Sequence, residues 1–153
     1  MPDMELLSLD LRSPLDYTGI EDPPLSASLM KLGMGSDMAE GEEELFIFDE
    51  DDLVYFDQDE GPVLRRPLPR PRFHGRRVAG AEGPASGLVA SLAPGVYAFV
   101  QWRPSDEEEL MAGLEWFARE AWWQRAAAKG PFILRRIRED GALATQAMRR
   151  AEH

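Results

Sequence analysis

Residues 87–149 decide the fold, and they read GLVASLAPGVYAFVQWRPSDEEELMAGLEWFAREAWWQRAAAKGPFILRRIREDGALATQAMR. Two apolar runs near the start of this stretch, Leu88–Leu92 and Val96–Trp102, have the composition of strands. The Pro-Gly pair between them suits a type II turn or a β-bulge. Alternation within the second run predicts one face formed by Val96, Ala98, Val100 and Trp102 and another formed by Tyr97, Phe99 and Gln101.

A long amphipathic helix is predicted after these strands. Ser105 can cap the amide of Glu108, whose side chain can reach back toward the cap. The helix should continue to about Ala128, because the Gly-Pro pair at 130–131 terminates it. The strand-like segments 132–138 and 142–149 then flank an Asp-Gly pair, which is typical of a tight hairpin. We therefore expect an α+β protein with an antiparallel sheet and one long amphipathic helix.

The first half of the chain permits the same order of elements. Residues 5–12 alternate as a strand does, and apolar residues at helical spacing predict a short helix over 25–32. The apolar runs 45–48 and 53–56 predict a hairpin around four carboxylates.

Two pseudo-repeated β-α-β-β units, residues 5–57 and 88–149, are therefore an alternative that the sequence leaves open. They would lie within a single domain of residues 1–153. Residues 61–86, rich in proline and arginine, would form an extended or irregular connector between the two halves.

Composition indicates a folded cytoplasmic protein. The chain of 153 residues is 44% hydrophobic and has no cysteine, so disulfides and thiolate chemistry are excluded. No apolar run approaches the roughly 20 residues that cross a bilayer, and the acidic start lacks the features of a secretory signal. With two histidines in total, a zinc site is not expected, and we predict no metal and no cofactor.

Charge is distributed unevenly along the chain. Residues 1–60 carry 18 acidic and 2 basic side chains, which gives −16. Residues 61–80 carry six arginines and no acid, which gives +6, and residues 81–153 carry 10 acidic and 9 basic side chains, which gives −1; the sum is the net charge of −11. We expect this acidic chain to be repelled by nucleic acid and by anionic membranes overall.

The arginines of the middle segment form a basic arm with three interpretations. A partner with an aromatic groove could recognise its proline-rich backbone, or the arginines could contact phosphate. Alternatively the arginines pair with the acidic first half of the same chain. The arm consists of Arg65, Arg66, Arg70, Arg72, Arg76 and Arg77.

The predicted helix carries two apolar stripes. One is an ordinary core-facing stripe built around Leu110, Leu114 and Phe117 and widened by Trp122. Trp116 and Trp123 lie seven residues apart on roughly the opposite side, where an apolar surface needs a cover. Another part of the chain could cover it, a homodimer or partner interface could use it, or it could wall a cleft for an apolar ligand.

No catalytic signature is present. The sequence lacks a nucleophile elbow, a phosphate-binding glycine loop and an H-E-x-x-H motif. Tyr97, Glu115 and His74 could act as acids or bases, but no motif places them together. The acidic stretches lack the ligand order of a calcium loop. The sequence therefore gives no ground for predicting an enzyme.

The segment Leu92–Phe99, followed by an amphipathic helix, resembles the gyrase-inhibitor-like family of bacterial small-molecule-binding domains. In that family a Pro/Gly-Gly-x-Tyr strand precedes the second helix, and two β-α-β-β repeats surround a central cleft. The resemblance implies a non-enzymatic binding module in which Tyr97 lines the cleft. The short first helix and the basic arm depart from the family's pattern.

We thus predict a binding module for a small apolar or cationic aromatic ligand, since an acidic cleft with tryptophan walls favours cations. The alternative is an acidic protein-interaction or inhibitor module that docks on a basic partner surface. The aromatic residues that we expect to bind ligand or partner are Trp116, Trp123, Tyr97 and Trp102.

Overall fold

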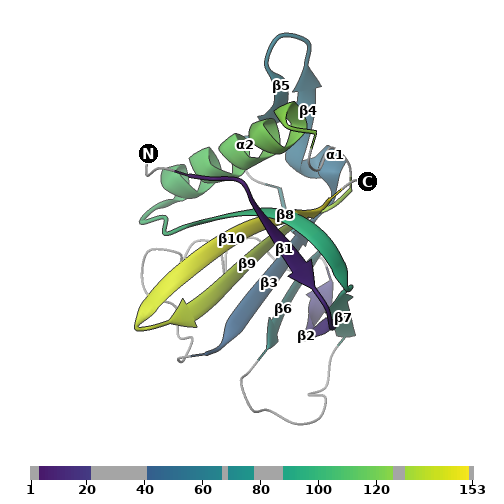
Figure 1. The fold of residues 1–153 in the computed structure, drawn as a ribbon, viewed down its shortest axis with the longest axis vertical. Coiled ribbons are helices and arrows are strands. Elements are labelled where there is room, and N and C mark those ends of the chain that lie inside the picture. Colours follow the sequence, from purple (N-terminus) through teal and green to yellow (C-terminus); the bar gives the residue numbers. More distant parts are fainter. Residues whose placement is uncertain (1–3, 22–40, 67–68, 78–87, 126–129, 152–153) are drawn as a thin grey trace.

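The structure is a computed structural model, and it describes residues 4–21, 41–66, 69–77, 88–125 and 130–151. These residues form ten strands and two helices (Figure 1). In chain order they are β1 (Leu7–Leu11), β2 (Leu15–Glu21), β3 (Glu43–Phe48), α1 (Glu50–Leu53), β4 (Val54–Asp57), β5 (Gly61–Leu64), β6 (Phe73–Arg77), β7 (Leu88–Leu92), β8 (Gly95–Trp102), α2 (Glu107–Trp123), β9 (Phe132–Glu139) and β10 (Ala142–Arg150).

Eight strands form one antiparallel sheet in the order β1-β8-β10-β9-β3-β6-β2-β7, and the sheet is strongly curled (Figure 1). The two ends of the sheet are close to one another in sequence. At one end β1 pairs with β8 as far as Leu11↔Gly95, and at the other end β2 pairs with β7 from Leu15↔Leu92. Residues 12–14 join β1 to β2, and residues 93–94 join β7 to β8. The two ends of the sheet are therefore connected by two short chain segments.

The curled sheet has a core on each face. The inner face holds a cluster that includes Tyr17, Leu45 and Met148, all fully buried. The outer face packs against α2 through a second cluster that includes Val100 and Phe117. The predicted alternation along β8 is confirmed from Tyr97 onward, because Ala98, Val100 and Trp102 belong to the cluster on the helix side while Tyr97 and Phe99 belong to the inner one.

Helix α2 begins one residue later than predicted. Asp106 is the N-cap, and its carboxylate accepts from the amide of Glu109 at 2.8 Å. Glu109 reaches back to the amide of Ser105 at 3.0 Å. The helix start is thus shifted by one position, with Asp106 as the cap in place of Ser105, since aspartate caps as well as serine does. The helix ends at Trp123, and part of the predicted extension to Ala128 lies outside the described residues.

The closing hairpin of β9 and β10 is confirmed. Glu139 pairs with Ala142 across the turn, and the two turn residues have positive φ angles, 51° at Asp140 and 77° at Gly141. Two successive residues of this kind match the twist of antiparallel strands, which is why an Asp-Gly pair predicts such a turn.

The hairpin predicted over residues 45–56 is wrong. β3 pairs with β6 and β9, while β4 pairs with β5 in a separate two-stranded sheet. The carboxylates between the two runs form the one-turn helix α1, not a hairpin turn. β3 is buried on both faces, so it is a central strand that takes its neighbours from distant parts of the chain.

The segment predicted as an irregular connector contains β5 and β6, and β6 lies between β2 and β3 in the sheet. Leu15–Glu21 form β2, a strand that the sequence pattern did not predict. The short helix predicted over 25–32 lies outside the described residues, so the pseudo-repeat stays a prediction.

Candidate functional site

The hairpin of β4 and β5 projects beyond the sheet at the top of Figure 1, beside the C-terminal end of α2. Side chains of α2 hold the outer edge of β5. The carboxylate of Glu115 accepts from the amide of Leu64 at 3.1 Å, and Nε of Arg119 donates to the carbonyl of Pro62 at 3.3 Å. The helix therefore fixes a hairpin that would be marginally stable alone.

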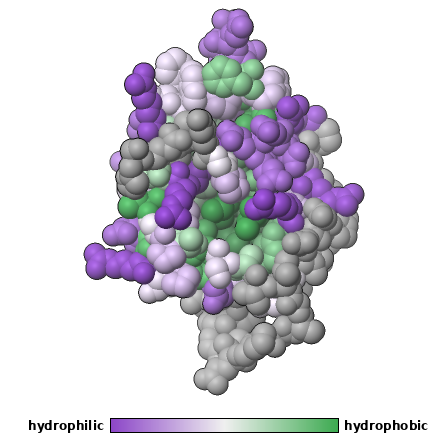
Figure 2. Space-filling view, turned by 90° about the vertical axis from the view of Figure 1, so that its right-hand side faces the viewer, coloured by the Kyte–Doolittle hydropathy of each residue, from purple (hydrophilic) through white to green (hydrophobic). Residues whose placement is uncertain are grey.

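An aromatic cluster covers the junction of this hairpin with the helix. The ring of Trp122 lies edge-on to Phe56 at 5.2 Å and to Trp123 at 4.9 Å between centroids. Phe56 is 60% exposed and Trp123 is 64% exposed. We call these three residues the aromatic surface. Figure 2 shows a small hydrophobic patch in this upper part of the molecule, bordered by hydrophilic atoms.

The turn between β4 and β5 is ordered, and it packs closely against Trp122 of the aromatic surface. The Asp57 carboxylate accepts from the amides of Asp59 at 2.8 Å and Glu60 at 3.1 Å, which orders the turn. Gly61 then adopts φ 81°, and a Cβ there would lie 2.9 Å from the ring of Trp122. A glycine at this position lets the indole pack directly on the backbone.

The chain segment that carries Phe56 is rich in carboxylates. Residues 49–60 hold seven acidic side chains and no basic one. Some of them are neutralised by distant arginines, as in the pairs Asp49–Arg72 and Glu50–Arg149 at 3.0 and 3.1 Å. Within the described part of the chain, no ion pair engages the exposed acids Asp51, Asp52 and Asp59. This segment therefore carries a net negative charge, which favours cations.

The four residues predicted to bind a ligand or partner do not lie together. Trp123 belongs to the aromatic surface, whereas Trp116 is half-buried against the outer core. Trp102 is 5% exposed, and its indole packs so closely on α2 that a Cβ at Gly113 would lie 2.3 Å from it. Tyr97 is buried inside the curled sheet.

The side chain of Tyr97 is held inside the protein by a hydrogen bond of its hydroxyl group. Its hydroxyl donates to the carbonyl of Ala93 at 2.6 Å, which fastens the corner between β7 and β8. Burial raises the pKa of the Tyr97 phenol, although the charge of Arg150 opposes that change. The phenol is therefore neutral at ordinary pH.

The sequence reasoning missed Phe56 and assigned Trp122 to the core stripe of the helix. Phe56 stands in an apolar run with carboxylates on both sides, a pattern that also fits a buried strand. Only the pairing of β4 with β5, and not with β3, reveals that this ring is exposed. Trp122 is partly exposed because the helix ends at the next residue.

The basic arm is divided among several contacts. Arg72 pairs with Asp49, and Arg76 pairs with Glu44 at 3.1 Å, as the intrachain interpretation predicts. Arg65 lies 5.4 Å from the ring centre of Tyr55. The remaining arginines differ: Arg66 lies 3.7 Å from the sulfur of Met111, Arg70 is exposed, and the side chain of Arg77 lies outside the described residues.

A buried charge cluster lies on the outer face of the sheet. Glu44 is 1% exposed and is hydrogen bonded to the fully buried guanidinium of Arg136. His74 lies 3.6 Å from Glu44 and stacks on Phe46 with ring centroids 4.4 Å apart. Burial alone would raise the pKa of Glu44, but the hydrogen bond from His74 and the charge of Arg136 outweigh it and lower the pKa to about 2.

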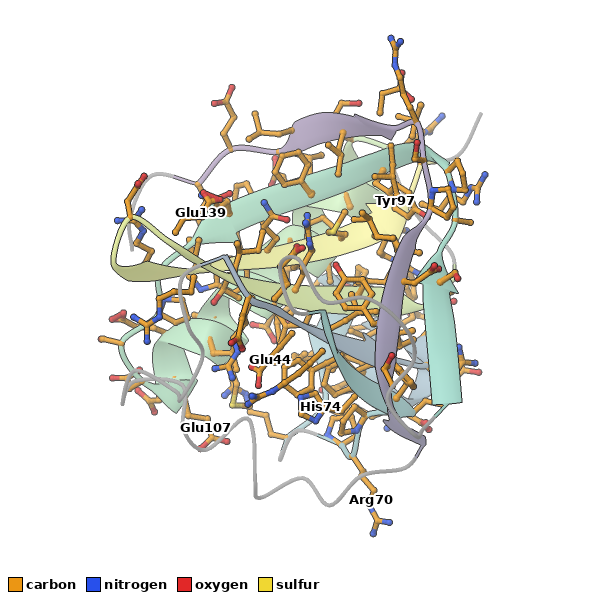
Figure 3. All side chains as sticks on the ribbon, turned by 90° about the horizontal axis from the view of Figure 1, so that it is seen from below. Glu44, Arg70, His74, Tyr97, Glu107 and Glu139 are labelled. Carbon is orange, nitrogen blue, oxygen red and sulfur yellow. The ribbon has the colours of Figure 1, made fainter. Side chains whose placement is uncertain are left out.

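The three acid–base candidates lie in different places. Figure 3 shows Glu44 and His74 near one another and Tyr97 well away from both. His74 is on the outer face of the sheet, Tyr97 is inside it, and Glu115 is hydrogen bonded to the amide of Leu64. The described residues thus bring no two of them together as a catalytic pair.

In the described ranges, no three His, Cys, Asp or Glu side chains are grouped as metal ligands. No helix in this part of the chain is long and apolar enough to span a bilayer. No protein-family model matches the sequence, and no curated protein matches it either. The resemblance to the gyrase-inhibitor-like family therefore stays a prediction.

Proposed function

We propose that the protein is a non-enzymatic interaction module that binds a basic segment of a partner protein at the aromatic surface. The observation that carries the proposal is the exposure of Phe56 and Trp123, 60% and 64%. Phe56 belongs to an acidic segment in which Asp51, Asp52 and Asp59 have no ion-pair partner among the described residues. Exposed aromatic side chains are frequent energetic anchors of interfaces. The carboxylates of residues 49–60 favour a cationic partner and repel an acidic one.

The rigidity of the site also supports this function. Trp122 is held between Phe56 and the backbone of Gly61, and α2 fixes the hairpin through Glu115 and Arg119. A surface that is ordered before binding loses less conformational entropy when the partner arrives.

The test uses a heptapeptide of alternating lysine and valine, and a glutamate–valine peptide as its charge control. We expect the basic peptide to change tryptophan fluorescence and the acidic peptide to have no effect. Trp123→Ala should weaken binding at least about tenfold, whereas Gln124→Ala, also exposed at the end of the helix, should not. Equal binding of both peptides, or no effect of Trp123→Ala, would contradict the proposal.

The small-ligand function predicted from the sequence is tested in the same titration. Benzyltrimethylammonium offers an aromatic ring and a cation without a peptide backbone, and exposed indoles attract such cations. A tighter, Trp123-dependent response to this compound than to the basic peptide would favour the small-ligand alternative.

A further inference from the structure

We infer that the partner segment binds as an extended strand along the outer edge of β4. This inference rests on the proposed function and adds the mode of binding and the kind of partner. In the described residues, β4 has β5 on one side and no strand on the other. The corresponding edge of β5 is occupied by Glu115 and Arg119 of α2. As far as the described residues show, the hairpin edge open to a partner is therefore that of β4.

The register shows which backbone groups point outward. Phe56 is paired with Pro62, which has no N–H, so this is a pair without mutual hydrogen bonds. The amide of Arg65 donates to the carbonyl of Leu53 at 2.8 Å, so the residues that bond across the hairpin are the odd-numbered ones. The even-numbered Phe56 lies between such pairs. Phe56 therefore directs its N–H and C=O away from β5.

The two outward-facing residues of β4 differ in whether their backbone N–H already has a partner. The N–H of Val54, the other outward-facing residue of β4, donates to the carbonyl of Glu50 and closes α1. In the described part of the chain, no residue is hydrogen bonded to the backbone of Phe56, which is 60% exposed. An extended peptide can pair with both groups of Phe56, as in strand addition to an open sheet edge.

Charge identifies the occupant as a basic peptide and not a second copy of the protein. The edge lies between the exposed acids Asp51 and Asp52 on one side and Asp59 on the other. Two such edges brought together would place like charges opposite one another, which is a device that natural proteins use against edge pairing. A strand of alternating basic and apolar residues would place its cations near these acids and its apolar side chains near the aromatic surface.

Two variants at one position separate the backbone from the side chain. Phe56→Ala and Phe56→Pro both remove the ring, but only proline also removes the outward N–H. The hairpin ladder is retained in both, because position 56 makes no hydrogen bond to β5. We expect Phe56→Pro to bind the lysine–valine heptapeptide at least about tenfold more weakly than Phe56→Ala does.

A second measurement uses the unmodified protein. The lysine–valine heptapeptide is compared with two analogues in which the odd or the even amides are N-methylated, and methylation on the amides that face β4 should abolish binding. Equal binding by both variants, with all three peptides also equivalent, would overturn strand addition and leave the proposed function intact. If the unmodified peptide does not bind the unmodified protein, both proposals are overturned.

Discussion

Replacement of Glu44 by glutamine should destabilise the protein by an amount that depends on pH. The variant Glu44→Gln keeps the shape of the side chain and removes the charge that faces Arg136, Arg76 and His74. Arg136 is fully buried, so the substitution leaves a guanidinium without its carboxylate in a region that water does not reach. Breaking a buried pair in this way costs on the order of 3–5 kcal/mol.

The pKa of Glu44 gives a second route to the same magnitude. Its ordinary value is 4.5, and the folded protein lowers it to about 2. At about 1.4 kcal/mol for each pH unit, ionisation of Glu44 contributes about 3 kcal/mol to the free energy of unfolding. Because the folded pKa is the lower one, this contribution is fully present above pH 4.5 and is lost as the pH falls toward 2.

The assay is urea unfolding followed by tryptophan fluorescence, measured for the unmodified protein and the variant at several pH values. The difference in free energy of unfolding should be about 3 kcal/mol at neutral pH and should shrink steadily below pH 4.5. Glu139→Gln, which changes an exposed carboxylate at the end of β9, is the control and should have little effect at any pH. A difference for Glu44→Gln that stayed constant with pH would refute the reasoning.

Two further predictions concern glycines packed on indoles. Gly113→Ala places a methyl group 2.3 Å from the buried ring of Trp102, so thermal denaturation should show a loss of about 1–2 kcal/mol although alanine favours the helix; a gain in stability would contradict the packing. In Gly61→Ala the new methyl group clashes with Trp122, and the residue must also adopt a positive φ angle, which alanine disfavours. In Gly141→Ala, at φ 77° with open space around it, only the positive φ angle destabilises the variant. Gly61→Ala should therefore be the more destabilising of the two by about 1 kcal/mol and should change tryptophan fluorescence; equal effects would count against contact between Gly61 and Trp122.

The sequence by itself determined the elements whose signals are local. The Asp-Gly turn at 140–141, the strands on either side of Pro94 and the core-facing stripe of α2 each depend on neighbours within a few residues. Turn conformation, alternation and helical spacing are properties of short segments, so they can be read without the rest of the chain. Even the error at the helix N-terminus was a shift of one residue between two good caps.

Tertiary structure decided which strands pair and which aromatic side chains stay exposed. β3 takes its neighbours from residues 73–77 and 132–139, and no local signal distinguishes that pairing from a hairpin with residues 54–57. The exposure of Phe56 follows from the choice of β5 as the partner of β4, and the exposure of Trp123 follows from the end of α2. The core stripe of the helix follows from the spacing of apolar residues along a short segment. The aromatic surface depends on contacts between segments about 65 residues apart in sequence, and these contacts form only when the chain has folded.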